Sequence, residues 1–168
     1  MDNNKIYFWY PVYTNPRAEK KVFELLTKKG IETYLPIYRQ QKQWSDRKKW
    51  VLEPLIKSYV FVNILPSQIG EVLMTKGICR FIYFSGVIAT MPSRQIEQLK
   101  LLLASETELE VIERNFIKGE KIIIVAGPLQ GLIGEIVDYK TQKRLLIKID
   151  HIGRSLLVKI NSVFTEPL

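Results

Sequence analysis

After residue 116 the sequence consists of short apolar segments that alternate with turn signals, and this pattern limits the fold more than any other feature. The segments cover residues 122–125, 132–137, 145–149 and 156–160, with turns expected at 127–128, 138–143 and 150–153. Four or five short strands in about fifty residues would leave exposed edges if they formed an open sheet. The pattern therefore predicts a small β-barrel over residues 116–168.

The residues before 105 mix strand and helix patterns. Strands are predicted over residues 5–13, 31–38 and 55–65. A helix is expected up to Gly30, with Asn15 as its N-cap and Pro16 at its first position. Its apolar stripe consists of Ala18, Val22, Leu25 and Leu26. Further helices are predicted over 67–74 and 94–104, the latter capped by Ser93. The fold class is α+β: an N-terminal α/β sandwich with a mixed or antiparallel sheet, followed by the small barrel.

Residues 39–53, "RQQKQWSDRKKWVLE", carry five basic and two acidic side chains together with Trp44 and Trp50. The Ser45-Asp46 pair is typical of a turn. We therefore expect a basic hairpin or long loop that protrudes from the first domain.

The acidic residues 105–115 have little periodic pattern and are predicted to link a domain of residues 1–104 to the barrel domain of residues 116–168. An extension of the preceding helix is the alternative. Residues 1–104 hold 16 Lys/Arg and 8 Asp/Glu, whereas residues 105–168 hold 9 of each, so the whole net charge of +8 lies in the first part. Two halves of such different charge are expected to meet different partners, although a basic domain can also carry its charge for solubility alone.

The stretch "VAGPLQGLIGEIVDY", residues 125–139, raises the question of a phosphate site. It lacks the Lys-Ser/Thr of a P-loop, and a strand pattern rather than a helix follows Gly134. Its glycines are predicted to bend and turn barrel strands. With one His151 and one Cys79, the chain offers no zinc site and no Cys/His pair with further partners. We expect no enzymatic activity, no cofactor and no metal.

The apolar segments are too short to cross a bilayer, and the N-terminus, which has an acidic residue and aromatics, does not resemble a signal peptide. A single cysteine cannot form a disulfide within the chain, so a reducing cytoplasm is the expected location. We expect no membrane partner and a monomeric protein.

The basic part is unusually rich in aromatic residues on strands whose other faces already supply a core. Alternation places Tyr59 and Phe61 opposite Val60, Val62 and Ile64. A sheet buried on both faces is the ordinary explanation. The alternative is that part of the second face is open and apolar, as at a protein-binding surface.

Five motifs in order resemble the NusG family of transcription elongation factors: "WYPVYTNPRAEKKVFELL" (9–26), "YLP" (34–36), "EPLIKSYVFV" (53–62), "KGICRFIYF" (76–84) and "KGEKIIIVAGPLQGLIGEIVD" (118–138). The resemblance covers nearly the whole chain. It implies an NGN domain followed by a KOW domain with an SH3-like barrel. It also implies binding of the NGN domain to the clamp helices of RNA polymerase, which suppresses pausing.

The matching motifs assign polymerase-contacting aromatics to this sequence: Tyr13, Tyr59, Phe61, Phe81 and Phe84. Phe81 and Phe84 cannot lie on the same face of one strand, so one of them can instead belong to the core. Specialised members similar to RfaH also touch the non-template DNA strand. The corresponding candidates for nucleic-acid binding are Asn15, Arg17, Lys20, Lys21, Lys28, Thr75, Lys76 and Arg80. Lys and Arg side chains can contact phosphates, whereas Asn and Thr can read base edges. Any single lysine can equally well lie on a solvated helix face without contacting nucleic acid.

The compact length and the basic hairpin look most like UpxY-type antiterminators, which act on polysaccharide operons. The RfaH-like His-Thr element that engages the far side of the polymerase cleft is missing from "SQIGEVLMTKG". Because the C-terminal segments are β-branched and interrupted by glycines, no helical autoinhibited state is expected. Two alternatives stay open: a general NusG-type factor, and a KOW protein that binds RNA or the ribosome. Nascent RNA is an alternative to non-template DNA as the nucleic-acid partner. For the KOW domain, the resemblance implies either the ribosome, bound through NusE, or Rho as the partner.

Overall fold

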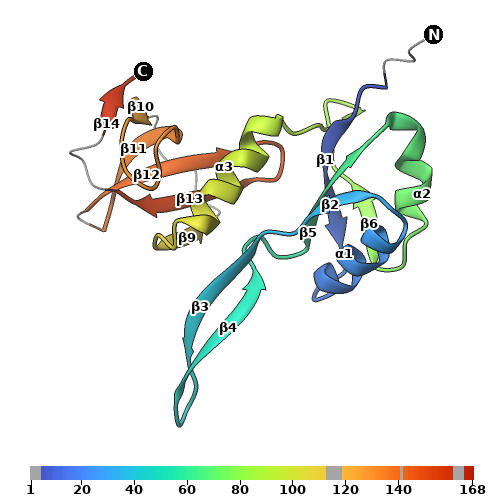
Figure 1. The fold of residues 1–168 in the computed structure, drawn as a ribbon, viewed down its shortest axis with the longest axis horizontal. Helices are drawn as coiled ribbons and strands as arrows, with labels where there is room; N and C mark the ends of the chain where they lie inside the picture. The colour runs from blue at the N-terminus through green and yellow to red at the C-terminus, as the bar shows by residue number, and fades with distance from the viewer. Residues whose placement is uncertain (1–4, 113–118, 141, 161–164) are drawn as a thin grey trace. The chain divides into compact units, whose positions relative to one another are not determined.

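The computed structural model describes residues 5–112, 119–140, 142–160 and 165–168. The chain divides into two compact units, with the boundary between Ser93 and Arg94. The elements are mixed α and β, with few helices and several antiparallel sheets (Figure 1). No helix among the described residues is long and apolar enough to cross a lipid bilayer.

The first unit is built on a four-stranded sheet with the strand order β2-β5-β1-β6. Its strands are β1 (Phe8–Thr14), β2 (Glu32–Tyr34), β5 (Tyr59–Ile64) and β6 (Ile78–Phe81). Both β1 and β2 pair antiparallel with β5, so they are parallel to each other and need the crossover that helix α1 (Glu19–Lys28) supplies. A 3-10 turn at Pro66–Gln68 and helix α2 (Ile69–Leu73) lie where the short helix is predicted.

The core of this unit lies between one face of the sheet and helices α1 and α2. The alternation that the sequence predicts is confirmed: Val60, Val62 and Ile64 are buried there together with Val22 and Leu26 of α1. The remaining fully or nearly buried members of this cluster are Tyr10, Val12, Ile31, Leu35, Val72 and Phe81.

The predicted N-cap at Asn15 is wrong. Helix α1 begins at Glu19, and the N–H of Ala18 donates to the carbonyl of Asn15 in a turn in which Arg17 has a φ of 64°. The side chain of Asn15 accepts a hydrogen bond from Cys79 Sγ at 2.8 Å instead of capping the helix. Local sequence favours Asn15 as a cap, but pairing of its N–H with the Gly77 carbonyl holds it in line with the sheet.

The basic hairpin predicted over residues 39–53 is confirmed. Strands β3 (Ile37–Gln43) and β4 (Lys48–Pro54) pair with each other in a separate two-stranded sheet, and the N–H of Trp44 donates to the Arg47 carbonyl at the turn. The hairpin extends away from the four-stranded sheet (Figure 1). A second hairpin, β7 (Tyr83–Phe84) and β8 (Val87–Ile88), turns at Ser85 and Gly86, both with positive φ as a two-residue hairpin turn requires.

The second unit contains helix α3 (Ser93–Ala104) and a six-stranded antiparallel sheet with the order β14-β10-β11-β12-β13-β9. The strands are β9 (Leu109–Ile112), β10 (Lys121–Ile124), β11 (Ile133–Tyr139), β12 (Gln142–Ile149), β13 (Arg154–Lys159) and β14 (Thr165–Pro167). Gln95 Oε1 accepts a hydrogen bond from the Asp150 N–H. Helix α3 therefore groups with this sheet, whereas the sequence pattern predicts it in the first domain.

Part of the predicted linker is a strand. Residues 109–112 form β9, which pairs with β13 and buries Leu109 and Ile112. Acidic residues within and before this four-residue segment obscure its strand alternation in the sequence. Its pairing with β13, more than forty positions later, makes it a strand. The predicted linker end at 113–115 and the predicted barrel start at Phe116 lie outside the described residues.

The glycine stretch shapes the sheet of the second unit. Gly127 and Gly131 have positive φ values of 84° and 88°. The N–H groups of Gln130, Gly131 and Leu132 donate to the backbone carbonyls of Gly127, Ile124 and Leu129, respectively. A Cβ at Gly134 would lie 2.6 Å from the carbonyl oxygen of Leu146 on β12. The amides that a phosphate cradle would need are therefore engaged within the fold.

Candidate functional site

The second face of the four-stranded sheet carries a group of aromatic side chains. Tyr13 of β1 lies opposite Tyr59 of β5, and their rings meet edge to face with centroids 5.3 Å apart. Phe61 lies next to Tyr34 of β2, with ring centroids 6.5 Å apart. We call Trp9, Tyr13, Tyr34, Tyr59 and Phe61 the aromatic face; alternation along each strand brings them to one side.

Most of the aromatic face is buried. Phe61 has 0% and Tyr59 8% of its surface exposed, while Tyr13 is half-buried. These exposures are those of the whole chain, and the core formed with α1 and α2 lies on the opposite face of the sheet. The role of Tyr59 and Phe61 at a partner surface therefore stays a prediction. Within the sheet, the ring of Tyr59 packs edge to face on that of Tyr13, and the ring of Phe61 is tilted against that of Tyr34.

Phe81 and Phe84 occupy different environments. Phe81 is 1% exposed in the core of the first unit, where its ring lies 5.7 Å from that of Tyr10. Phe81 therefore takes the core role that the sequence left open for one of these two residues, because β6 directs this side chain into the core of the first unit. Phe84 lies on β7 and is 58% exposed, together with Tyr83 at 61% and Val87 at 65%. We call these three residues the apolar hairpin patch.

Four residues come together where β1 pairs with β6. Arg80 lies opposite Tyr13 in the register, with its guanidinium carbon 5.5 Å from the centroid of the Tyr13 ring. Cys79 donates from Sγ to Asn15 Oδ1, which fixes the orientation of the exposed Asn15 amide. Residues Tyr13, Asn15, Cys79 and Arg80 form what we call the ladder-end cluster. Exposed Lys76 lies shortly before it in the chain.

Three predicted nucleic-acid residues, Thr75, Lys28 and Lys21, lie outside both this cluster and the groove described below. Thr75 is 4% exposed, and its Oγ1 accepts a hydrogen bond of 2.9 Å from Lys29 Nζ. The expectation that Thr75 reads base edges is wrong, because the hydroxyl is used to anchor Lys29. Lys28 lies at the last turn of α1, about 15 Å along the helix from its start. Lys21 pairs with Glu24 on the exposed side of α1.

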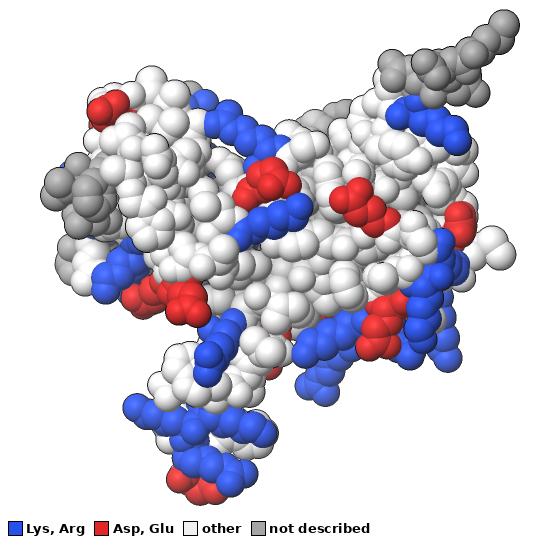
Figure 2. Space-filling model, viewed as in Figure 1, with Lys and Arg blue, Asp and Glu red and all other residues white. Residues whose placement is uncertain are grey.

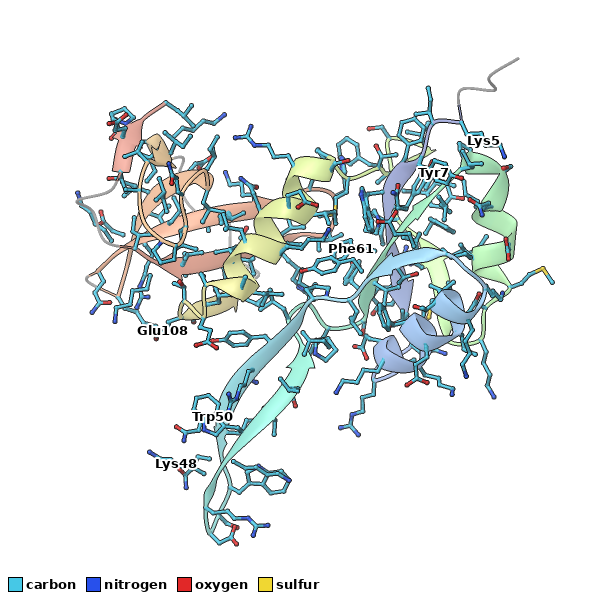
Figure 3. The ribbon with its side chains drawn as sticks, viewed as in Figure 1. Lys5, Tyr7, Lys48, Trp50, Phe61 and Glu108 are labelled. Carbon is cyan, nitrogen blue, oxygen red and sulfur yellow. The ribbon has the colours of Figure 1, made fainter. Side chains whose placement is uncertain are left out.

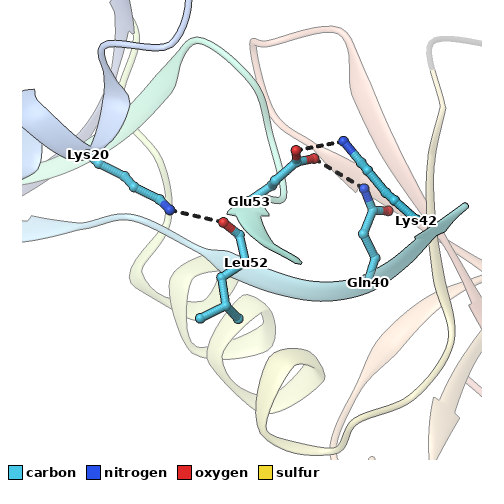
Figure 4. A network of polar contacts seen from close by, with 5 residues as sticks. All are labelled: Lys20, Gln40, Lys42, Leu52 and Glu53. Carbon is cyan, nitrogen blue, oxygen red and sulfur yellow. Dashed lines mark hydrogen bonds and ion pairs between the residues drawn. The ribbon is translucent and has the colours of Figure 1, made fainter. Parts of the chain in front are cut away.

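Arg17 and Lys20 instead line an open groove of about 830 Å³ between the start of α1 and strand β4. The groove is lined by Pro16, Arg17, Glu19, Lys20, Lys42, Trp50, Val51, Leu52, Glu53, Pro54, Lys57 and Ser58. Lys20 Nζ donates to the Leu52 carbonyl at 2.9 Å and thereby ties α1 to the hairpin (Figure 4). Sequence reasoning missed Lys42, Trp50 and Lys57 as members of this site; the only signal was the basic and aromatic composition of the hairpin.

The electrostatics of the groove centre on Glu53. Lys42 Nζ lies 2.6 Å from Glu53 Oε1, and Gln40 Nε2 donates to Oε2 at 3.2 Å. The hydrogen bond from Lys42, against some desolvation of the carboxyl, holds the pKa of Glu53 below its ordinary value. Lys and Arg side chains gather over the hairpin and over α1 (Figure 2). The groove thus lies in the basic part of the first unit.

Comparisons with known proteins agree with this fold. Residues 7–100, more than half of the chain, match the family model described as transcription termination factor nusG. The chain is also 19% identical over 170 residues to the transcription termination/antitermination protein NusG of Rickettsia typhi, which covers 94% of this chain and 88% of that protein. Among solved structures, Thermotoga maritima NusG has a TM-score of 0.56 at 22% identity, with 96% of this chain and 97% of that chain covered.

These findings define a transcription factor of the termination and antitermination class. The chain belongs to the NusG family.

Proposed function

We propose that this chain is a specialised NusG-family antiterminator that binds RNA polymerase through its first unit, an NGN domain, and contacts the non-template DNA strand. Its second unit is a KOW-type barrel domain. The observation that carries the DNA contact is the ladder-end cluster. There Cys79 orients the amide of Asn15, and the next residue of β6, Arg80, holds its guanidinium over the ring of Tyr13. An amide can read a base edge while a guanidinium holds a phosphate.

The polymerase contact is assigned to the apolar hairpin patch and to Tyr13. Three large apolar side chains that stay more than half exposed on one short hairpin are typical of a protein-binding site. Tyr59 and Phe61 belong to the same proposed surface: the ring of Tyr59 packs against that of Tyr13, and the ring of Phe61 packs against that of Tyr34.

A specialised role is favoured over a general elongation role by the basic β3–β4 hairpin, which carries Trp44 and Trp50 at its exposed surface. A general factor, or an RNA-binding KOW protein, is the alternative. The second of these is less favoured because residues 105–168 have equal numbers of basic and acidic residues, whereas RNA binders concentrate positive charge where they bind.

Transcription in vitro through a terminator in the leader of the protein's own operon tests the proposal. Read-through is expected to rise when the protein is added. Asn15→Ala and Arg80→Gln should reduce that gain without loss of polymerase binding, with Arg94→Gln as the matched control for charge. Phe84→Ala should weaken co-purification with polymerase, whereas Val125→Ala, an exposed apolar residue of the second unit, should not. Unchanged read-through with the unmodified protein would contradict the proposal.

A further inference from the structure

The groove between α1 and β4 has the properties of a binding site in its own right. One wall is the turn before α1, with Arg17, and the first turn of α1, with Lys20; the other is β4 from Trp50 to Pro54 with Lys42 of β3. Lys57 and Ser58, which follow β4 in the sequence, also line the groove. All of these residues belong to the first unit, so the site is complete within one compact part of the chain.

Positive charge prevails in the groove. Four basic side chains line it, whereas its two carboxylates are already engaged by the protein: Glu19 is buried and accepts from the Ser58 N–H at 2.6 Å, and Glu53 accepts from Lys42 and Gln40. Arg17 and Lys57 form no ion pair with any acidic residue in the described part of the chain. The charge of Arg17 is therefore available to an anionic ligand, whereas Lys57 also interacts over a longer distance with Glu53, whose pKa it helps to lower.

The backbone on the α1 side of the groove is held in an uncommon conformation. Arg17 and Ser58 have positive φ values of 64° and 62°, and the N–H of Thr14 donates to the Ser58 carbonyl at 2.9 Å. Left-handed residues other than glycine cost about 1–2 kcal/mol each and persist where the surroundings hold them. This arrangement presents Arg17 at the groove.

An aromatic platform lies on the opposite wall. Trp50 is 55% exposed and projects from the hairpin (Figure 3). The guanidinium carbon of Arg39 lies 4.8 Å from the centroid of its ring, which fixes the plane of the indole. Trp50 shares its hairpin face with Arg39 and lines the same groove as four basic side chains. An exposed indole in a basic groove can stack an unpaired base while the phosphates of the strand follow the positive charge.

We propose that this groove binds a single-stranded nucleic acid, with a base stacked on Trp50 and the backbone phosphates at Arg17, Lys20 and Lys57. A duplex fits less well because its bases are stacked on each other and offer no free face to an indole. An acidic peptide would use the cations but leave the platform unused. The site goes beyond the ladder-end cluster of the proposed function and needs no polymerase.

Fluorescence anisotropy with the full-length protein tests the proposal, with a labelled single-stranded DNA, an RNA of the same sequence and the corresponding duplex as probes. Trp50→Ala is expected to weaken binding of a single strand about tenfold, because one base loses its stacking partner. Trp50→Phe should restore most of the affinity. Trp44→Ala is the matched control, because Trp44 is equally exposed at the tip of the same hairpin and does not line the groove.

The phosphate contacts are tested by salt dependence. Arg17→Gln combined with Lys57→Gln should lower the slope of log affinity against log salt by about 1.4, since each single-strand phosphate contact contributes about 0.7. Lys121→Gln combined with Lys143→Gln removes the same charge from the second unit and should leave the slope unchanged. A preference for the DNA or the RNA strand identifies the source of the ligand, and either supports the site.

Three results would overturn the proposal: equal affinities of the Trp50→Ala and Trp44→Ala variants, duplex binding as tight as single-strand binding, or an unchanged salt slope after loss of Arg17 and Lys57. If Arg80→Gln alone abolished binding while the groove variants bound normally, the groove would be excluded and the ladder-end cluster would stand. Failure of the groove is thus distinguishable from failure of the proposed antiterminator function.

Discussion

Lys20 and Leu52 are 32 positions apart in the sequence, and a hydrogen bond of 2.9 Å from Lys20 Nζ to the Leu52 carbonyl joins them. The bond connects the first turn of α1 to the outer edge of β4. A two-stranded hairpin is only marginally stable by itself, so a tie of this kind restrains its base.

Lys20→Met is expected to loosen the hairpin without unfolding the first unit. The bond is solvent-exposed, so its loss should cost no more than about 1 kcal/mol. Amide hydrogen exchange is the measurement: protection should fall in β3 and β4 and stay unchanged in β1 and β5. Lys21→Met is the control, because Lys21 pairs with Glu24 on its own helix. Equal exchange in the two variants would show that the tie does not restrain the hairpin.

The hairpin base should also respond to acid. The pKa of Glu53 is lowered in the folded state, so the Lys42–Glu53 pair stabilises the hairpin above the unfolded pKa of the carboxyl, about 4.3, and this stability is lost as the pH falls through the folded pKa. A carboxyl NMR titration should give Glu53 a midpoint below that ordinary value.

Lys42→Met is expected to raise the Glu53 midpoint, since the principal hydrogen bond to the carboxylate is removed. Lys48→Met, near the hairpin turn, provides the comparison and should leave the midpoint in place. A midpoint that is the same in all three proteins would mean that Lys42 does not determine the ionisation of Glu53.

Gly134→Ala should destabilise the second unit. Its Cβ would lie 2.6 Å from the Leu146 carbonyl oxygen and 2.8 Å from Leu145 Cδ1, so β11 and β12 would have to move apart. Overpacking of this kind costs about 1–3 kcal/mol. Gly70→Ala in α2 is the control, because a Cβ there meets no atom within 4 Å, and it should be neutral or stabilise by about 0.5–1 kcal/mol. Thermal unfolding of both variants decides the point.

Phe81→Ala and Phe84→Ala should have opposite consequences. Phe81 is fully packed in the core, so its truncation should cost about 3–5 kcal/mol of the free energy of unfolding of the first unit. Phe84 is mostly exposed, and its truncation should change stability by less than about 0.5 kcal/mol. Chemical denaturation measures both. Comparable losses of stability would place both rings in the core and remove the apolar hairpin patch.

Much of the fold can be predicted from short-range patterns. The alternation of Val60, Val62 and Ile64, the stripe of Val22 and Leu26 and the turn at Ser45-Asp46 all appear where they are expected. These signals are reliable because burial on one face imposes a period of two on a strand and 3.6 on a helix. Asn15 shows the limit: it has the right chemistry for a cap, but a hydrogen bond to Gly77, 62 positions later, decides its conformation.

The candidate site depends more strongly on long-range contacts. Sequence alone determined that the first part is basic and aromatic, that it contains a hairpin with two tryptophans, and that glycines of the second part turn and bend strands. Tertiary structure decided that Phe81 is core while Phe84 is exposed, that Thr75 anchors Lys29, and that Arg17, Trp50 and Lys57 share one groove. The physical reason is that residue type and periodicity act over a few positions, whereas burial and charge proximity arise from segments brought together by strand pairing and helix packing.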